Sequence, residues 1–111
     1  ASTRLGLRTL MVTTDTSKIG FMSCNPSIGG LAKGHMVREI DVLGGAMAVA
    51  ADKTCIQFKR LNSRKGPAVR GSRAQCDKHL YGQHMIDLLQ ATPGLTLLQS
   101  EAKSLILSHH Q

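Results

Sequence analysis

Short apolar runs and polar segments alternate along the N-terminal part of the chain. Thr9–Thr13 is apolar and β-branched and follows a glycine closely, so it predicts a buried strand. Ala1–Leu5 has the character of the last turn of a helix, which Gly6 would end. Thr16–Gly30 has the composition of a loop, because prolines and glycines interrupt any apolar period.

The loop gives way to a helical period. Met36, Ile40 and Leu43 recur four and three residues apart, with Val37 beside them, which predicts a helix that a pair of glycines ends. A second short helix is expected over Ala46–Ala51. Apolar and polar residues alternate in Ile56–Lys59, and this pattern predicts a strand at the edge of a sheet.

The second half of the chain predicts a loop, a helix and two strands. Leu61–Arg73 has loop composition, with Gly-Pro and a further glycine as turn signals. Ala74–Ala91 is the clearest helix, and a Pro-Gly pair stops it. Leu95–Gln99 and Ala102–Leu107 follow as short strands, so the fold class is α/β. The apolar stripe of the helix consists of Cys76, Leu80, Tyr81, Met85, Leu88 and Leu89.

Basic residues are concentrated in one region of the chain. The chain of 111 residues forms one domain at most, and its formal net charge is +7, with 14 Lys and Arg against 7 Asp and Glu. Seven basic residues and no acidic residue lie between positions 53 and 73. A basic segment of this kind is either a solvated face or a strip that binds phosphate. Aromatic residues make up only 3% of the chain, so stacking of bases is not predicted.

Cysteine, histidine and hydropathy patterns exclude several classes of protein. Three widely spaced cysteines form neither a disulfide framework nor a zinc pattern, and they fit a reducing cytoplasmic compartment. His79 and His84 are five residues apart, on different faces of the predicted helix, so no metal site is assigned. No apolar run approaches the roughly 20 residues of a membrane span, and no membrane association is predicted.

The motif SCNPSIGGLAKG, residues 23–34, concentrates the candidate chemistry. Gly29 and Gly30 allow unusual backbone angles ahead of a helix, whose amino end attracts anions, and Lys33 adds a cation there. Cys24 precedes the turn, where the helix start and Lys33 would favour its thiolate. Glycine-rich segments also occur in plain turns, and Cys24 has a buried structural cysteine as its alternative.

Two long strings resemble one known family. MSCNPSIGGLAKGHMVREIDVLGG and IQFKRLNSRKGPAVRGSRAQCDKHLY are similar to the N-terminal flavin-binding part of the GidA/MnmG family. The resemblance implies a partial Rossmann-like FAD-binding domain that lacks its first strand and GxGxxG loop, with residues 1–111 a fragment of it. It implies modification of the tRNA wobble uridine at carbon five, with FAD, NADH and the methylene of methylenetetrahydrofolate. The implied partners are tRNA, an MnmE-type GTPase and a second copy in a homodimer.

The motif and the resemblance together give candidate site residues. The motif makes Cys24 the candidate catalytic residue and Gly29, Gly30 and Lys33 candidate cofactor contacts. By its position in the family, Ala102 would contact the cofactor through its main chain. Asp15, just past the predicted strand, is a weak candidate for a ribose contact, and a loop or cap role is the favoured interpretation.

Three cations are expected to contact the phosphates of tRNA or of FAD, and the sequence leaves open which. They are Lys65, Arg70 and Arg73. Two alternatives to the implied enzyme remain: a related folate- and FAD-dependent tRNA methyltransferase, and a non-catalytic basic RNA-binding module.

Overall fold

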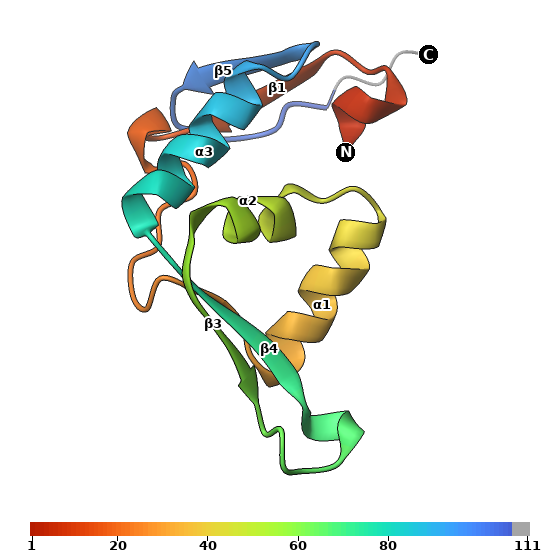
Figure 1. Cartoon of the computed structure of the whole chain (residues 1–111). Coiled ribbons are helices and arrows are strands. Elements are labelled where there is room, and N and C mark those ends of the chain that lie inside the picture. The colour runs from red at the N-terminus through yellow and green to blue at the C-terminus, as the bar shows by residue number, and fades with distance from the viewer. Residues whose placement is uncertain (108–111) are drawn as a thin grey trace.

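Two separate sheets organise the chain, in a computed structural model that describes residues 1–107. Strands β1 (Thr9–Thr13) and β5 (Leu95–Gln99) form a parallel pair. Strands β2 (Ser27–Gly29), β3 (Cys55–Leu61) and β4 (Gly71–Cys76) form an antiparallel sheet with β4 in the middle. Figure 1 shows the parallel pair at one end of the molecule and the β3–β4 hairpin extending to the other.

Three α-helices join and cover these sheets. Helices α1 (Leu31–Val42) and α2 (Ala46–Thr54) lie on one side of the antiparallel sheet, against β2 and β4. Helix α3 (Lys78–Gln90) packs against β5 and α2 and so links the two ends of the molecule (Figure 1). The short 3-10 helices are η1 (Ser2–Leu5), η2 (Thr16–Lys18) and η3 (Pro67–Val69).

Small side chains fill the core, as the scarcity of aromatic residues requires. Ala50 and Cys76 are completely buried, and Tyr81 is the one aromatic residue of the core cluster in the described part of the chain. Burial raises the pKa of the Cys76 thiol, so this cysteine is a neutral core residue, as predicted. The remaining members of the core cluster are Ile28, Val37, Ala51 and Ala74.

Several predicted elements are confirmed. The β1 and β5 strands have the predicted bounds, and β3 is an edge strand of its sheet. The first turn is a 3-10 helix that Gly6 ends in a left-handed conformation, with φ of 80°. Both α1 and α2 are present, and Gly44 follows α1 with the same left-handed φ of 80°.

The predicted helix Ala74–Ala91 is wrong at its start. Residues 74–76 belong to β4, because each pairs with β2 or β3, and the predicted loop Leu61–Arg73 likewise runs into this strand. The α3 helix begins only after Asp77, whose carboxylate accepts hydrogen bonds from the amides of His79 (2.9 Å) and Leu80 (3.0 Å). Ala74 and Cys76 alternate with polar residues, and the pairing of β4 with both β2 and β3 makes this segment a strand and not the start of the helix.

Two further expectations are corrected. Ser27–Gly29 lies in the predicted loop but forms the short strand β2 along the edge of β4. Ala102–Leu107 forms no strand. The apolar residues whose period predicted α1 point mostly outward, with Met36 60% and Leu43 84% exposed, while Val37 beside them is buried. The inner face of α1 is therefore the one that carries Val37.

The described chain is elongated. Its extents are 61 × 33 × 25 Å and its radius of gyration is 17.2 Å, against about 13 Å for a compact domain of about 100 residues. Large apolar side chains such as Leu5, Val42 and Leu43 are more than three-quarters exposed. None of the helices that the described residues form has the length and apolar character required to cross a bilayer.

We expect Asp77→Ala to lower the melting temperature at pH 7. Asp77→Asn should lower it much less, because asparagine also caps helices well. The amides of Leu80 and His79 hold the pKa of Asp77 below its ordinary value. A lowered folded-state pKa adds stability above the unfolded pKa of about 3.9, and this stability is lost as the pH falls through the folded value.

Thermal unfolding of the parent and both variants between pH 7 and pH 2 checks this expectation. The difference in melting temperature between the parent and Asp77→Ala should become smaller below about pH 4. A difference that stays constant down to pH 2 would contradict the role of the charged cap.

Candidate functional site

The loop before β2 presents Cys24 to solvent. The main chain that follows Cys24 is fixed, because the Ser27 amide donates to the Asn25 carbonyl (2.7 Å) and the Cys76 amide donates to the Pro26 carbonyl (2.7 Å). Cys24 itself is exposed, whereas Cys76 is buried. The interpretation of Cys24 as a buried structural cysteine is therefore wrong, and its catalytic role stays a prediction.

The surroundings of Gly29 and Gly30 differ, although both residues adopt backbone angles that favour glycine. Both have positive φ values, 119° and 115°. A Cβ atom on Gly29 would collide with the backbone of β4, where it would come within 2.8 Å of the Arg73 Cα atom and closer still to the Ser72 carbonyl oxygen. A Cβ atom on Gly30 would meet nothing within 4 Å. Gly29 therefore serves the packing of the sheet, and the space beside Gly30 is open to a ligand.

The amino end of α1 is strongly positive. Gly30 occupies the N-cap position without a side chain to cap the helix, and the first turn contains no acidic residue. Lys33 lies in that turn, and its ammonium donates to the Ser27 carbonyl at 3.2 Å. Uncapped amides, the helix dipole and a lysine together favour an anion at this place.

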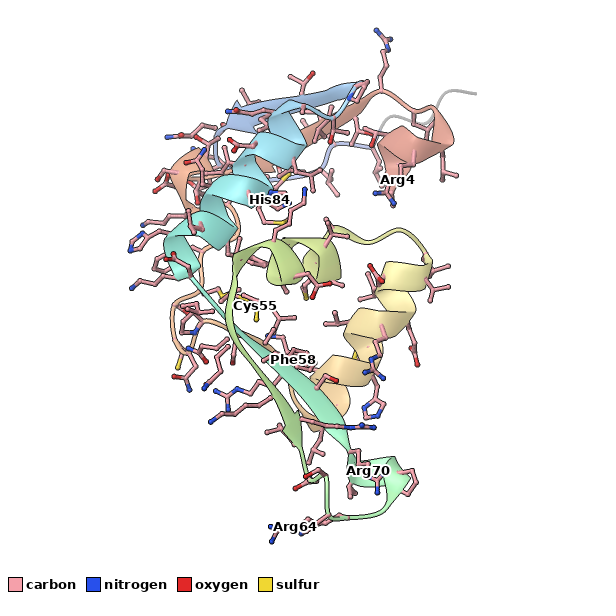
Figure 2. The ribbon with its side chains drawn as sticks, in the orientation of Figure 1. Arg4, Cys55, Phe58, Arg64, Arg70 and His84 are labelled. Atoms are coloured by element: carbon pink, nitrogen blue, oxygen red, sulfur yellow. The ribbon has the colours of Figure 1, made fainter. Side chains whose placement is uncertain are left out.

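The tip of the β3–β4 hairpin is held by its own side chains. The Asn62 side-chain amide donates to the Val69 carbonyl (2.9 Å), and Arg70 Nε donates to the Lys65 carbonyl (2.9 Å). Asn62 has a positive φ of 54°, which asparagine tolerates. Figure 2 shows Arg64 and Arg70 at this tip. One of the predicted cations, Arg70, thus shapes the loop that carries Lys65.

Arg73 lies apart from the other two predicted cations. It belongs to β4 and pairs in register with Lys59 of β3 and with Gly29 of β2. The structure therefore divides the predicted phosphate strip into a hairpin tip with Lys65 and Arg70 and a sheet face with Arg73. Lys59, which the sequence did not single out, belongs to that sheet face.

A hollow that the sequence did not indicate lies between the antiparallel sheet and helices α1 and α2. Its volume is about 210 Å³, and its apolar lining includes Val37, Ala51 and Phe58, while Arg38 and Asp52 are among its polar residues. Phe58 extends from β3 into the space beside α1 (Figure 2). Its ring is 62% exposed. Only the tertiary arrangement brings these residues together, so no sequence signal pointed to this hollow.

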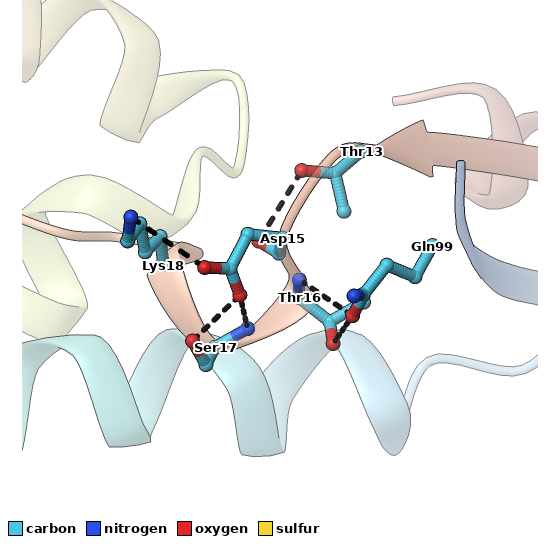
Figure 3. Close-up of polar contacts among 6 residues, drawn as sticks. All are labelled: Thr13, Asp15, Thr16, Ser17, Lys18 and Gln99. Atoms are coloured by element: carbon cyan, nitrogen blue, oxygen red, sulfur yellow. Dashed lines mark hydrogen bonds and ion pairs between the residues drawn. The ribbon is translucent and has the colours of Figure 1, made fainter. Parts of the chain in front are cut away.

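Asp15 caps η2 at the carboxyl end of β1. Its carboxylate accepts hydrogen bonds from the Ser17 amide (2.9 Å) and hydroxyl (2.6 Å) and lies 3.6 Å from the Lys18 ammonium (Figure 3). These contacts with Ser17, then Lys18, lower the pKa of Asp15. The cap interpretation is confirmed, and Gln99 of β5 joins the same edge by accepting from the Thr16 hydroxyl at 2.9 Å.

Ala102 follows the carboxyl end of β5 in an exposed segment without regular structure. The described residues contain no group of three or more His, Cys, Asp and Glu side chains placed to hold a metal ion. The structure thus places Gly30 and Lys33 at the β2–α1 junction, Cys24 in the loop before β2, and Ala102 three residues beyond the carboxyl end of β5.

Known proteins are similar in sequence along almost the whole of this chain. Residues 1–111 match the family described as glucose inhibited division protein A. The chain is 71% identical over 107 residues to the tRNA uridine 5-carboxymethylaminomethyl modification enzyme MnmG of Bdellovibrio bacteriovorus, covering 96% of this chain and 17% of that protein. It is 52% identical over 111 residues to the enzyme of the same name from a Sulfurihydrogenibium species, covering 100% of this chain and 18% of that protein.

Solved structures match the fold as well. GidA of Aquifex aeolicus in its form I crystal superposes with a TM-score of 0.93 and 48% identity, covering 97% of this chain and 18% of that one. The form II crystal gives a TM-score of 0.92. The mixed α/β arrangement, with one parallel and one antiparallel sheet, is therefore similar to part of that protein, and the chain spans less than a fifth of its relatives' length.

We expect Gly29→Ala to destabilise the protein severely, because its methyl group has no space against the β4 backbone and its φ is positive. Gly66→Ala is the matched control, since Gly66 has φ of −58° and open space around its Cβ position. Denaturant unfolding should show a large decrease in the free energy of unfolding for Gly29→Ala and little change for Gly66→Ala. Equal stabilities for the two variants would contradict the close backbone contact.

Proposed function

The chain belongs to the GidA/MnmG family of tRNA uridine modification enzymes, and from that premise we propose that it forms part of an enzyme that modifies the wobble uridine of tRNA at carbon five. The 71% identity to an MnmG enzyme over 107 residues carries this proposal. Residues 1–111 would be one piece of a larger FAD-binding domain of Rossmann type, in which β1 and β5 are neighbouring parallel strands. The enzyme would act in the cytoplasm.

FAD is the proposed resident cofactor, and the residues present fit such a group. The carboxyl ends of β1 and β5 lie at one edge, where parallel α/β sheets bind nucleotides. Gly30 leaves open space at an amino helix end that lacks acids and carries Lys33, and these features favour a bound phosphate. Ala102 would contact the cofactor through its main chain. The flavin would supply the electron transfer of the reaction, with NADH and a folate-derived methylene as co-substrates.

Cys24 is the proposed catalytic residue. Its side chain is exposed in a loop whose main chain is fixed at Asn25 and Pro26, so the thiol is held in place and accessible. A thiol in that position can attack an electrophilic carbon as a nucleophile or transfer a proton. The other two cysteines are less suited, because Cys55 is partly buried at the start of β3 and Cys76 is fully buried.

The positive hairpin tip supports contact with tRNA. Lys65 is exposed there, and Arg70 holds the loop in one shape by its hydrogen bond to the Lys65 carbonyl. A rigid positive tip suits the phosphate backbone of RNA. The name of the relatives favours this enzyme over a folate-dependent methyltransferase or a non-catalytic RNA-binding module. An MnmE-type GTPase and a second copy of the enzyme are the proposed protein partners.

Expression of the full-length enzyme in cells that lack MnmG tests the proposal. The modified wobble nucleoside should return to the tRNA, as measured by mass spectrometry of digested nucleosides. We expect Cys24→Ser in that enzyme to retain tRNA and FAD binding and to lose most of the modification, because serine keeps the size but not the nucleophilicity of cysteine.

Cys55→Ser serves as the matched control and should retain activity. Full modification by the Cys24→Ser enzyme would end the catalytic assignment. Absence of the nucleoside even with the parent enzyme would end the proposed function.

We expect Lys65→Ala to weaken tRNA binding and to reduce the salt slope of the binding constant by roughly one, as the loss of one phosphate contact predicts. Arg70→Ala should weaken binding further, because it also releases the loop from the Lys65 carbonyl. Filter binding or anisotropy across a salt series measures both effects. Lys78→Ala, an exposed lysine at the start of α3, is the control. Unchanged slopes for both loop variants would identify the tip as a merely solvated face.

A further inference from the structure

One face of the antiparallel sheet is not covered by any described helix. Helices α1 and α2 lie against the other face, on which Ala74 and Cys76 of β4 are buried. Successive side chains of a strand point to opposite faces, so Arg73 and Gln75 point away from these helices. They line a polar hollow of about 130 Å³ together with Gln57, Lys59 and Leu61 of β3.

The strand register places two cations opposite each other in this hollow. Lys59 pairs with Arg73, and Gln57 pairs with Gln75. Side chains directly opposite in an antiparallel pair are about 4.5–5.5 Å apart at Cβ, and like charges at that spacing repel each other. The arrangement therefore lowers the stability of the free sheet, unless an anion lies between the two cations.

No group in residues 1–107 compensates this charge. The side chains of Lys59 and Arg73 make no hydrogen bond or ion pair with any described residue, and the single ion pair in that part of the chain joins Lys18 to Asp15. Other basic side chains are engaged: Arg38 donates to the Ser72 hydroxyl (3.0 Å) and Arg70 to the Lys65 carbonyl (2.9 Å). Arg73 is also half-buried, so its uncompensated charge is less screened than that of a free surface residue.

The donors in the hollow match a phosphate group. A guanidinium binds two phosphate oxygens at once, and an ammonium acts as a point charge beside it. The amide groups of Gln57 and Gln75 supply further N–H donors along the same two strands.

Resting on the function proposed above, we propose that Lys59 and Arg73, with Gln57 and Gln75, form a phosphate subsite on the uncovered sheet face, separate from the hairpin tip. The phosphate belongs either to the backbone of the bound tRNA or to the dinucleotide cofactor, since both present the same chemistry. The subsite explains why the pairing of β3 with β4 sets Lys59 opposite Arg73 although the two charges repel each other.

The test uses the full-length enzyme with Lys59→Gln, Arg73→Gln and the double substitution, and with Lys78→Gln as the matched control. Inorganic pyrophosphate is the first probe, because it is independent of the enzyme's reaction. It should raise the melting temperature of the parent and of Lys78→Gln, and much less that of the double variant. Without the probe, the substituted enzymes should melt at the parent temperature or above, because the repulsion is gone.

Two further measurements identify the source of the phosphate. A tRNA salt slope reduced by roughly two in the double variant assigns the phosphate to RNA. Loss of bound flavin with an unchanged tRNA slope assigns it to the cofactor. The proposal is overturned if the double variant equals Lys78→Gln in pyrophosphate response, tRNA affinity and flavin content.

If the double variant does not fold, Lys59→Gln alone decides by the same criteria, since its side chain is exposed. Failure of the proposed function would appear differently, as a parent enzyme that leaves tRNA unmodified while pyrophosphate still stabilises it.

Discussion

The close backbone contact between Gly29–Gly30 and β4 is the constraint on which the rest of the structure depends. The Gly30 amide donates to the Ser72 carbonyl at 2.9 Å, and the space beside Gly29 admits no side chain. This contact fixes the end of β2 and the first residue of α1 against the central strand of the sheet. It therefore sets where the amino end of α1 lies.

The same contact connects three positively charged places. The amino end of α1 with Lys33 starts directly after Gly30, and Arg73 is the register partner of Gly29 on β4. The hairpin tip continues from the other ends of β3 and β4. Charges that lie far apart in sequence are thus held on one small sheet, whose helix-covered face buries Ile28, Ala74 and Cys76. Such a surface suits a polyanionic ligand better than isolated surface lysines would, because the backbone pairing fixes the positions of the charges.

Local pattern was sufficient where an element is defined by its own residues. The apolar run of β1, the period of α1 and the run of β5 gave the right elements, since each has a clear start or stop signal within a few residues. Local pattern failed at Ala74–Cys76, whose alternation continues into a helical stripe. It did not indicate which face of α1 is buried, since packing against β2 and β4 decides that Val37 is inside and Met36 outside.

The sequence by itself determined the family and the α/β class, because long motifs and local periods are properties of neighbouring residues. It also indicated Asp15 as a cap, which depends only on the next few amides. Tertiary structure alone decided that Gly29 is needed for packing while Gly30 is open, and that Arg73 faces Lys59 instead of joining Lys65 and Arg70. The approach of β2 to β4 joins segments more than forty positions apart, and the register of β3 against β4 depends on the hairpin between them. No local pattern encodes which of those segments will meet.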